Sequence, residues 1–194
     1  MTDTDLKPFA NPAPLGLVGF GLTTVLLSLV NAGILPSGGQ EVVIPMALAY
    51  GGLIQLIAGL LEFRTGNTFG MVAFLSYGAF WVWFALLLLF AGNGLIDLSK
   101  AGPTIGVALI LWGVFTFYMW IATFKIHTAL WLVFLTLWVT FLLLGIGNAF
   151  GLGLIGAIGG WVGILCGALA MYTSAAEVAN ESYGRVVLPV KSSR

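Results

Sequence analysis

Charge is what this sequence has least of. Only 7% of its 194 residues are Asp, Glu, Lys or Arg, and 60% are hydrophobic, whereas soluble domains carry about 25% charged residues. This composition excludes an ordinary soluble fold and is typical of a chain that lies mostly in lipid. The formal net charge is zero and the basic residues form no run, so nothing predicts a nucleic-acid partner.

The residue types that catalysis and metal binding need are equally scarce. The chain has one cysteine, Cys166, within an apolar stretch, and one histidine, His127. No disulfide framework, zinc cluster or haem ligand pair can be assembled from them. We expect Cys166 to be a buried small hydrophobe and His127 to be solvated or to lie among lipid headgroups. The sequence therefore predicts no enzyme, no cofactor and no metal site.

The few charged residues divide the chain into apolar segments, and the lengths of these segments count the membrane spans. A spanning helix needs about 20 apolar residues, and a charge at its centre costs at least about 2.5 kcal/mol. Residues 42–61 and 101–124 each fit one helix, as do residues 65–96 and the segment before residue 41. Residues 128–176 carry no charge and would be about 73 Å long as one helix. They must form two helices with a turn near residues 147–151, so we predict six transmembrane helices.

An even number of spans places both ends of the chain on the same side of the membrane. Six of the seven Lys and Arg residues fall on that side, and Lys100 falls opposite. The positive-inside rule then predicts that both termini are cytoplasmic. We expect one all-α membrane domain over residues 1–194 in the plasma membrane, with residues 1–13 as a cytoplasmic N-terminal segment and residues 177–194 as a cytoplasmic tail.

Small and aromatic residues suggest how the helices pack. Glycines recur every four residues in the predicted sixth helix, which favours close packing within the chain over a contact between subunits. Most of the tryptophans are expected to be anchors that face lipid or the interface. The glycines are Gly156, Gly160, Gly159, Gly163 and Gly167, and the tryptophans are Trp81, Trp83, Trp112, Trp120, Trp131, Trp138 and Trp161.

Nearly all polar residues inside the predicted spans are neutral. In lipid each must bridge helices or line a wet cavity, and together they suit a small polar or weakly acidic solute better than a bare ion. Glu62, at the end of the second span, is either an ordinary helix-end carboxylate or part of a pore mouth. The neutral residues are Thr23, Thr24, Asn31, Gln55, Asn67, Thr68, Tyr77, Thr136, Thr140 and Asn148.

The run Asn-Pro-Ala-Pro-Leu-Gly-Leu at residues 11–17 closely resembles the signature of the acetate uptake transporter family, the succinate and acetate permeases. Nearly the whole chain shares the resemblance, and residues 93–101 and the extreme N-terminus are least alike. The resemblance continues through residues 19–24, 50–52, 55, 58–62, 66–70, 76–78, 80–81, 111–116, 147–148, 160–161 and 184–189.

The resemblance implies a protomer of six helices, assembled as a ring-shaped homohexamer, in which each protomer has its own pathway for acetate and sometimes succinate. Family members are similar in having a hydrophobic and aromatic constriction, and the matching positions are Phe20, Tyr77 and Leu137. Core packing is the alternative role for each of these three. The other residues expected to bind substrate or line the pore are Asn11, Thr23, Thr24, Gln55, Glu62, Asn67 and Thr68.

The sequence thus predicts permeation of acetate and related small carboxylates, either linked to protons or through a channel. In our hypothesis, neutral donors near Thr23, Thr24 and Asn67 hold the acid before the constriction. Desolvation of a carboxylate in an apolar neck is costly, which favours the neutral acid there, or acetate accompanied by a proton. Two alternatives stay open: a urea or short-amide channel, and a protein that senses acetate without moving it.

Overall fold

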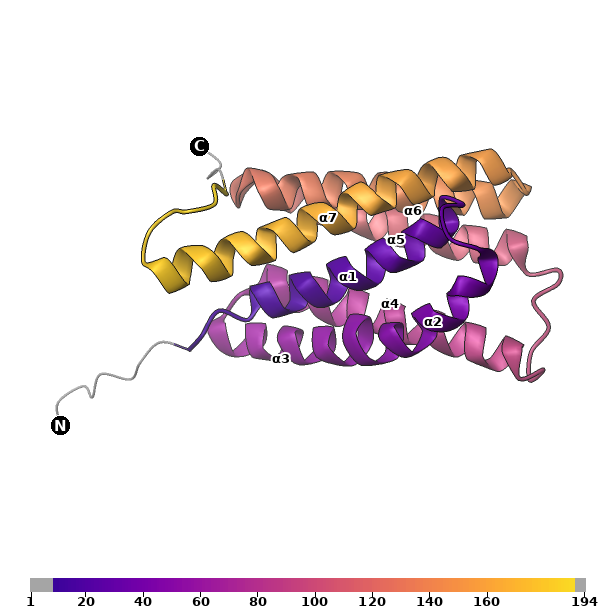
Figure 1. Ribbon diagram of the computed structural model, residues 1–194, viewed down its shortest axis with the longest axis horizontal. Helices are drawn as coiled ribbons and strands as arrows, with labels where there is room; N and C mark the ends of the chain where they lie inside the picture. The colour runs from indigo at the N-terminus through magenta and orange to yellow at the C-terminus, as the bar shows by residue number, and fades with distance from the viewer. Residues whose placement is uncertain (1–8, 191–194) are drawn as a thin grey trace.

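The computed structural model describes residues 9–190, and all regular secondary structure in that range is helical. Six helical segments of this range are long and apolar enough to cross a membrane. They run up and down the long axis of one bundle (Figure 1). The predicted number of spans is therefore confirmed.

The second span is built from several short helices, whereas the others are nearly continuous. The last helix extends to Tyr183, so residues 177–183, which we expected in the tail, are helical. In chain order the elements are α1 (Ala13–Asn31), η1 (Ser37–Gly39), α2 (Gln40–Met46), η2 (Ala47–Ile54), α3 (Gln55–Thr65), α4 (Thr68–Gly92), α5 (Gly102–Ala122), η3 (Thr123–Lys125), α6 (Thr128–Phe150) and α7 (Gly153–Tyr183).

The predicted turn between the last two spans is present where expected. Helix α6 ends at Phe150, and Gly151 follows with a φ of 65°. This left-handed conformation is strained for residues with a Cβ atom but costs glycine little. Gly151 therefore lets the chain reverse within a few residues and start α7.

The second span changes its helical geometry midway. Pro45 lies inside α2, where it has no N–H to donate and weakens the regular hydrogen-bond ladder. The π-helix η2 follows and leads directly into Gln55, the first residue of α3. Wider turns of this kind frequently accompany functional sites.

Close helix packing explains the regular glycines of the sixth span. A Cβ atom at Gly167 would lie 2.7 Å from the Gly21 carbonyl oxygen of α1, and one at Gly159 would lie 3.1 Å from Leu144 of α6. A Cβ atom at Gly160 would lie too close to the backbone of Ala32. One at Gly163 would lie too close to the side chain of Ser28. The preferred interpretation, packing within the chain, is thus confirmed for these four glycines, whereas a Cβ atom at Gly156 would meet nothing within 4 Å.

The tryptophans do not all behave as expected. Trp161 is 57% exposed, as an anchor that faces lipid would be, but Trp81 is only 2% exposed. The Trp81 ring packs in the core beside Gly51 of η2 and Phe80. Trp81 is therefore an exception to the lipid or interface position that we expected for most of the tryptophans.

Candidate permeation pathway

Two cavities lie inside the bundle, one after the other along its axis. The first has a volume of about 460 Å³ and is lined by Asn11 and Glu177, near the two ends of the described chain; we call it the terminal-side cavity. The second has a volume of about 270 Å³ and is lined by Gln40 and Asn148, near the opposite loops; we call it the far-side cavity. Figure 1 shows both ends of the described part of the chain, residues 9–190, at the same end of the bundle.

Phe20 of α1 and Leu137 of α6 line both cavities. Tyr77 of α4 lines the terminal-side cavity, and its ring centroid lies 5.8 Å from that of Phe20. All three side chains are at most 5% exposed. The structure therefore brings together the three residues expected at the constriction and puts two of them on the boundary between the cavities. We call Phe20, Tyr77 and Leu137 the neck.

The Tyr77 side chain is held firmly in this neck. Its hydroxyl group donates a hydrogen bond of 2.9 Å to Thr116 Oγ1, and Thr116 donates one of 2.7 Å to the Trp112 carbonyl oxygen. The rings of Phe115 and Phe134 lie 5.4 Å and 6.0 Å from the Tyr77 ring. We did not predict a role for Thr116, although it lies in residues 111–116, one of the stretches that carry the family resemblance.

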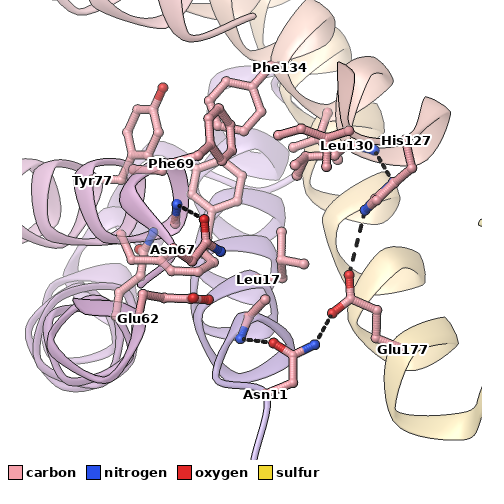
Figure 2. Close-up of a pocket in the computed structure, with 18 of the residues that line it drawn as sticks. Asn11, Leu17, Glu62, Asn67, Phe69, Tyr77, His127, Leu130, Phe134 and Glu177 are labelled. Carbon is pink, nitrogen blue, oxygen red and sulfur yellow. Dashed lines mark hydrogen bonds and ion pairs between the residues drawn. The ribbon is translucent and has the colours of Figure 1, made fainter. Parts of the chain in front are cut away.

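Glu62 is the most deeply buried charged residue of the terminal-side cavity, at 1% exposure. The Thr65 hydroxyl group donates to its Oε2 atom over 3.3 Å, whereas its Oε1 atom has no hydrogen-bond partner. Figure 2 shows its carboxyl group beside Asn67. Asn67 accepts a hydrogen bond of 3.1 Å from the Gly70 N–H group and so caps α4. A Cβ atom at Gly70 would lie 2.7 Å from both Asn67 Nδ2 and Glu62 Cδ, so this arrangement needs glycine there.

Three chain segments meet at the mouth of the terminal-side cavity (Figure 2). Asn11 Nδ2 donates to Glu177 Oε2 over 3.0 Å, and the other Glu177 oxygen lies 3.7 Å from His127 Nε2. His127 Nδ1 accepts a hydrogen bond of 3.1 Å from the Leu130 N–H group and caps α6. At 18% exposure, the His127 side chain is not freely solvated, and its expected place among lipid headgroups stays a prediction. Sequence reasoning missed His127 and Glu177 because 49 residues separate two side chains that meet only in the folded bundle.

The remaining polar predictions divide between the cavities. Gln55 lies in the terminal-side cavity at 1% exposure, with its Oε1 atom unpartnered. Thr24 lies in the far-side cavity with an unpartnered Oγ1 atom. The hypothesis of one site shared by Thr24 and Asn67 therefore needs correction, because the two residues line different cavities.

Two residues expected to line the pore lie outside the described lining of both cavities. Thr23 is fully buried, and its hydroxyl group donates to the Gly19 carbonyl oxygen over 2.8 Å. Its side chain packs against Gly51 of the neighbouring span. Thr68 is exposed at the start of α4. The structure thus corrects these two expectations, since Thr23 serves helix packing and Thr68 faces outward.

The two cavities differ in charge. Among its described lining residues, the terminal-side cavity has Glu62, His127 and Glu177. The far-side cavity has amide and hydroxyl groups, including Asn31 and Thr140, but no residue with a formal charge in its described lining. Within residues 9–190, no group of three His, Cys, Asp or Glu residues is placed to hold a metal ion.

Six helices that are long and apolar enough to cross a membrane, packed around two cavities that share Phe20 and Leu137 in their linings, define a helical membrane protein. The chain belongs to the GPR1/FUN34/yaaH family, which matches residues 1–192. The family resemblance expected from the sequence is thereby confirmed.

Named relatives agree with this assignment. The chain is 49% identical over 184 residues to the succinate-acetate/proton symporter SatP of Escherichia coli strain K12, which covers 95% of this chain and 96% of that protein. It is 39% identical over 203 residues to acetate permease A of Emericella nidulans, with coverage of 96% and 67%. The solved structure of the bacterial acetate channel SatP is similar with a TM-score of 0.90 at 48% identity, over 94% of this chain and 99% of that one.

Proposed function

We propose that this protein moves acetate, and succinate or other small carboxylates, across a membrane through a passage within each protomer. The observation that carries this proposal is the position of Phe20 and Leu137, which line the cavities on both sides of the neck. Relatives that are similar over almost the whole chain are named as an acetate permease, a symporter and an acetate channel.

The geometry supports a passage in three stages. An acid enters the terminal-side cavity past Asn11, crosses the apolar neck, and meets the amide and hydroxyl groups of the far-side cavity, among them Thr24 and Asn31. In the neck the acid must lose its hydration water. This desolvation costs a charged carboxylate far more free energy than it costs a neutral acid. Protons therefore accompany the solute through the neck.

Uptake of labelled acetate into proteoliposomes with an alkaline interior tests the proposal. Protein-free liposomes give the background, because neutral acetic acid also crosses lipid unaided. We expect uptake well above this background, and uptake that collapses when an ionophore removes the pH gradient. Uptake equal to the background would refute transport and favour a sensor that does not move acetate. Single-channel recording separates a channel from a carrier, and competition by urea tests the alternative of an amide channel.

We further propose that the protomers form a homohexameric ring in the plasma membrane, with both termini cytoplasmic and lipid around the ring. The family resemblance supports the ring, and the excess of Lys and Arg on the side of the termini supports the orientation. The mass of the detergent-solubilised protein, measured by light scattering, tests the hexamer. Labelling of a cysteine added at either end in intact cells tests the orientation.

A further inference from the structure

Glu177 of α7 connects two distant parts of the chain at the mouth of the terminal-side cavity. Its Oε2 atom accepts a hydrogen bond of 3.0 Å from Asn11, which precedes α1, and its Oε1 atom lies 3.7 Å from Nε2 of His127, which precedes α6. Figure 2 shows the three side chains with Glu177 in the middle. All three line the cavity. The starts of α1 and α6 therefore meet at a single carboxyl group.

The two side chains on either side of Glu177 are each tied to the helix that follows them. Asn11 Oδ1 accepts a hydrogen bond of 3.0 Å from the Ala13 N–H group, and His127 Nδ1 accepts one of 3.1 Å from the Leu130 N–H group. Both N–H groups belong to the first turn of a helix. A change in the distance from Glu177 to either side chain therefore moves the start of a helix relative to α7.

The two contacts of Glu177 differ in length. The contact with Asn11 is a hydrogen bond, whereas 3.7 Å to His127 exceeds the usual limit for a hydrogen bond of about 3.2 Å. Histidine is the side chain that ordinarily gains a positive charge as the pH falls from about 8 to about 5. A proton on His127 adds an attraction to the Glu177 carboxyl group, which shortens this distance. The contact with α6 therefore responds to a proton on the imidazole.

Few other titratable groups surround this pair. Glu62 of α3 lines the same cavity, and its carboxyl group interacts electrostatically with that of Glu177. Helix α4 adds Tyr77 to the described lining, and α1 adds no titratable group. Lys125, two residues before His127, is exposed and lines neither described cavity. A positive charge on His127 thus meets carboxyl groups, and at 18% exposure of each side chain of the pair, water reaches both.

The helices that meet at Glu177 also carry two residues of the neck. Phe20 is on α1 and Leu137 is on α6. Helix α7 packs closely against both helices through its glycines. A movement of the start of α6 toward α7 therefore narrows the entrance to the cavity that ends at the neck.

We propose that Asn11, His127 and Glu177 form a latch at the mouth of the terminal-side cavity, and that the latch closes when His127 takes up a proton from water. The protonated imidazole draws the Glu177 carboxyl group to hydrogen-bond distance, and Asn11 keeps the start of α1 attached to the same group. The three segments then lie closer together, and the entrance for solutes narrows.

This inference rests on the proposed function and on the proposed cytoplasmic position of both termini. Uptake of an acid releases protons in the cytoplasm. In this orientation, a fall in cytoplasmic pH closes the latch and limits further uptake. The latch thus protects the cell from an acid load.

Exchange of labelled acetate in proteoliposomes with the same pH on both sides tests the latch, because every copy meets that pH whatever its orientation. His127→Asn is the informative variant, since asparagine also caps helix starts but gains no charge. We expect the exchange rate of the unaltered protein, divided by that of His127→Asn, to fall about two- to fivefold between about pH 8 and about pH 6, the effect of a partly exposed ion pair on an equilibrium. The division removes the change in the fraction of acetic acid with pH. A constant ratio would overturn the proposal.

Variants of α7 then test the partner of His127. Glu177→Gln keeps an acceptor for Asn11 but removes the charge, so it should abolish the fall in this ratio. The double variant His127→Asn, Glu177→Gln should behave like either single variant, because both changes remove one contact. Glu181→Gln is the matched control and should keep the fall, since Glu181 lies one turn beyond Glu177, is exposed and lines neither described cavity. An unchanged fall in Glu177→Gln would refute the latch.

Access to the cavity provides a readout that does not depend on transport. A cysteine placed by Ala73→Cys lies in the lining of the terminal-side cavity, whereas Cys166 is fully buried. In detergent, the rate at which a charged methanethiosulfonate reagent labels this cysteine, divided by the rate in the His127→Asn background, should fall over the same range of pH. Glu177→Gln should remove this fall.

The two readouts separate the latch from the proposed function. If labelling slows as expected while proteoliposomes show no exchange at any pH, the proposed transport fails and the latch stands. Exchange well above the background of protein-free liposomes, with both ratios constant over pH, would refute the latch and leave the proposed transport intact.

Discussion

The Tyr77 hydroxyl group lies 2.9 Å from Thr116 Oγ1 and donates a hydrogen bond that joins α4 to α5 in the wall of the neck. Tyr77 and Thr116 are 3% and 0% exposed, so water cannot replace the bond. The bond fixes the Tyr77 ring, which lines the terminal-side cavity together with Phe20 and Leu137. Thr116 therefore supports the neck from outside the lining of the two cavities.

Thr116→Val, which keeps the shape of the side chain, should destabilise the protein. The Tyr77 hydroxyl group would then be buried without an acceptor, at a cost of about 1–3 kcal/mol. The midpoint of thermal unfolding in detergent measures this loss. Tyr77→Phe removes the donor and should cost less in the Thr116→Val background than alone, because no orphaned hydroxyl group remains. Costs that simply add would show that the bond contributes nothing.

Leu137→Ala should widen the neck and change which acids pass. Leu137 is 3% exposed and lines both cavities, so a smaller side chain joins the two spaces more broadly. We expect uptake of succinate to rise relative to acetate and formate, with a stability loss of about 2–5 kcal/mol. Leu132→Ala, on the same helix but outside the described lining of both cavities, is the control. Unchanged selectivity among the three acids in Leu137→Ala would mean that Leu137 is not part of the constriction.

The spans could be predicted because the bilayer imposes one simple rule on the chain. A buried charge is so costly that the spacing of charged residues counts the helices, and the glycine at residue 151 marks the turn that no charge reveals. The neck residues came instead from the family motifs. When a helix is apolar on every side, its sequence periodicity does not indicate which face lines a passage.

The departures from the sequence predictions share one cause: the local sequence does not indicate which residues of distant helices come into contact. Thr23 was expected in the pore, but its hydroxyl group bonds to the Gly19 carbonyl oxygen of its own helix. Glu177 appeared to be an ordinary residue near the end of the chain, yet it meets Asn11 across 166 positions. Trp81 was expected to face lipid because tryptophans usually do so in membrane proteins, but the small residue Gly51 leaves space for its ring.

Cys166 should be inert toward thiol reagents in the folded protein. Its side chain is fully buried, and the Sγ atom donates weakly to the Val133 carbonyl oxygen over 3.5 Å. A maleimide should therefore label it fully in denaturant and leave it unlabelled in mild detergent, as measured by mass spectrometry. A cysteine placed at the exposed Leu154 by Leu154→Cys is the positive control. Rapid labelling of Cys166 without denaturant would show that α6 and α7 separate readily.

Gly160 and Gly156 lie one turn apart on α7 and should respond in opposite ways to the same substitution. A Cβ atom at Gly160 would press on the backbone of Asn31 and Ala32 at the end of α1, whereas one at Gly156 would meet nothing within 4 Å. Backbone atoms cannot move out of the way by changing rotamer, as a side chain can. Gly160→Ala should therefore push α1 away from α7 and lower the free energy of unfolding by about 1–3 kcal/mol.

Gly156→Ala should raise stability instead, by about 0.5–1 kcal/mol, because alanine loses less backbone freedom than glycine when a helix forms. Thermal unfolding of both variants in the same detergent compares them directly. Because α1 carries Phe20, Gly160→Ala should also disturb the neck and reduce acetate uptake, whereas Gly156→Ala should leave it near the level of the unaltered protein. Equal behaviour of the two variants would contradict the close contact between α1 and α7 on which the neck depends.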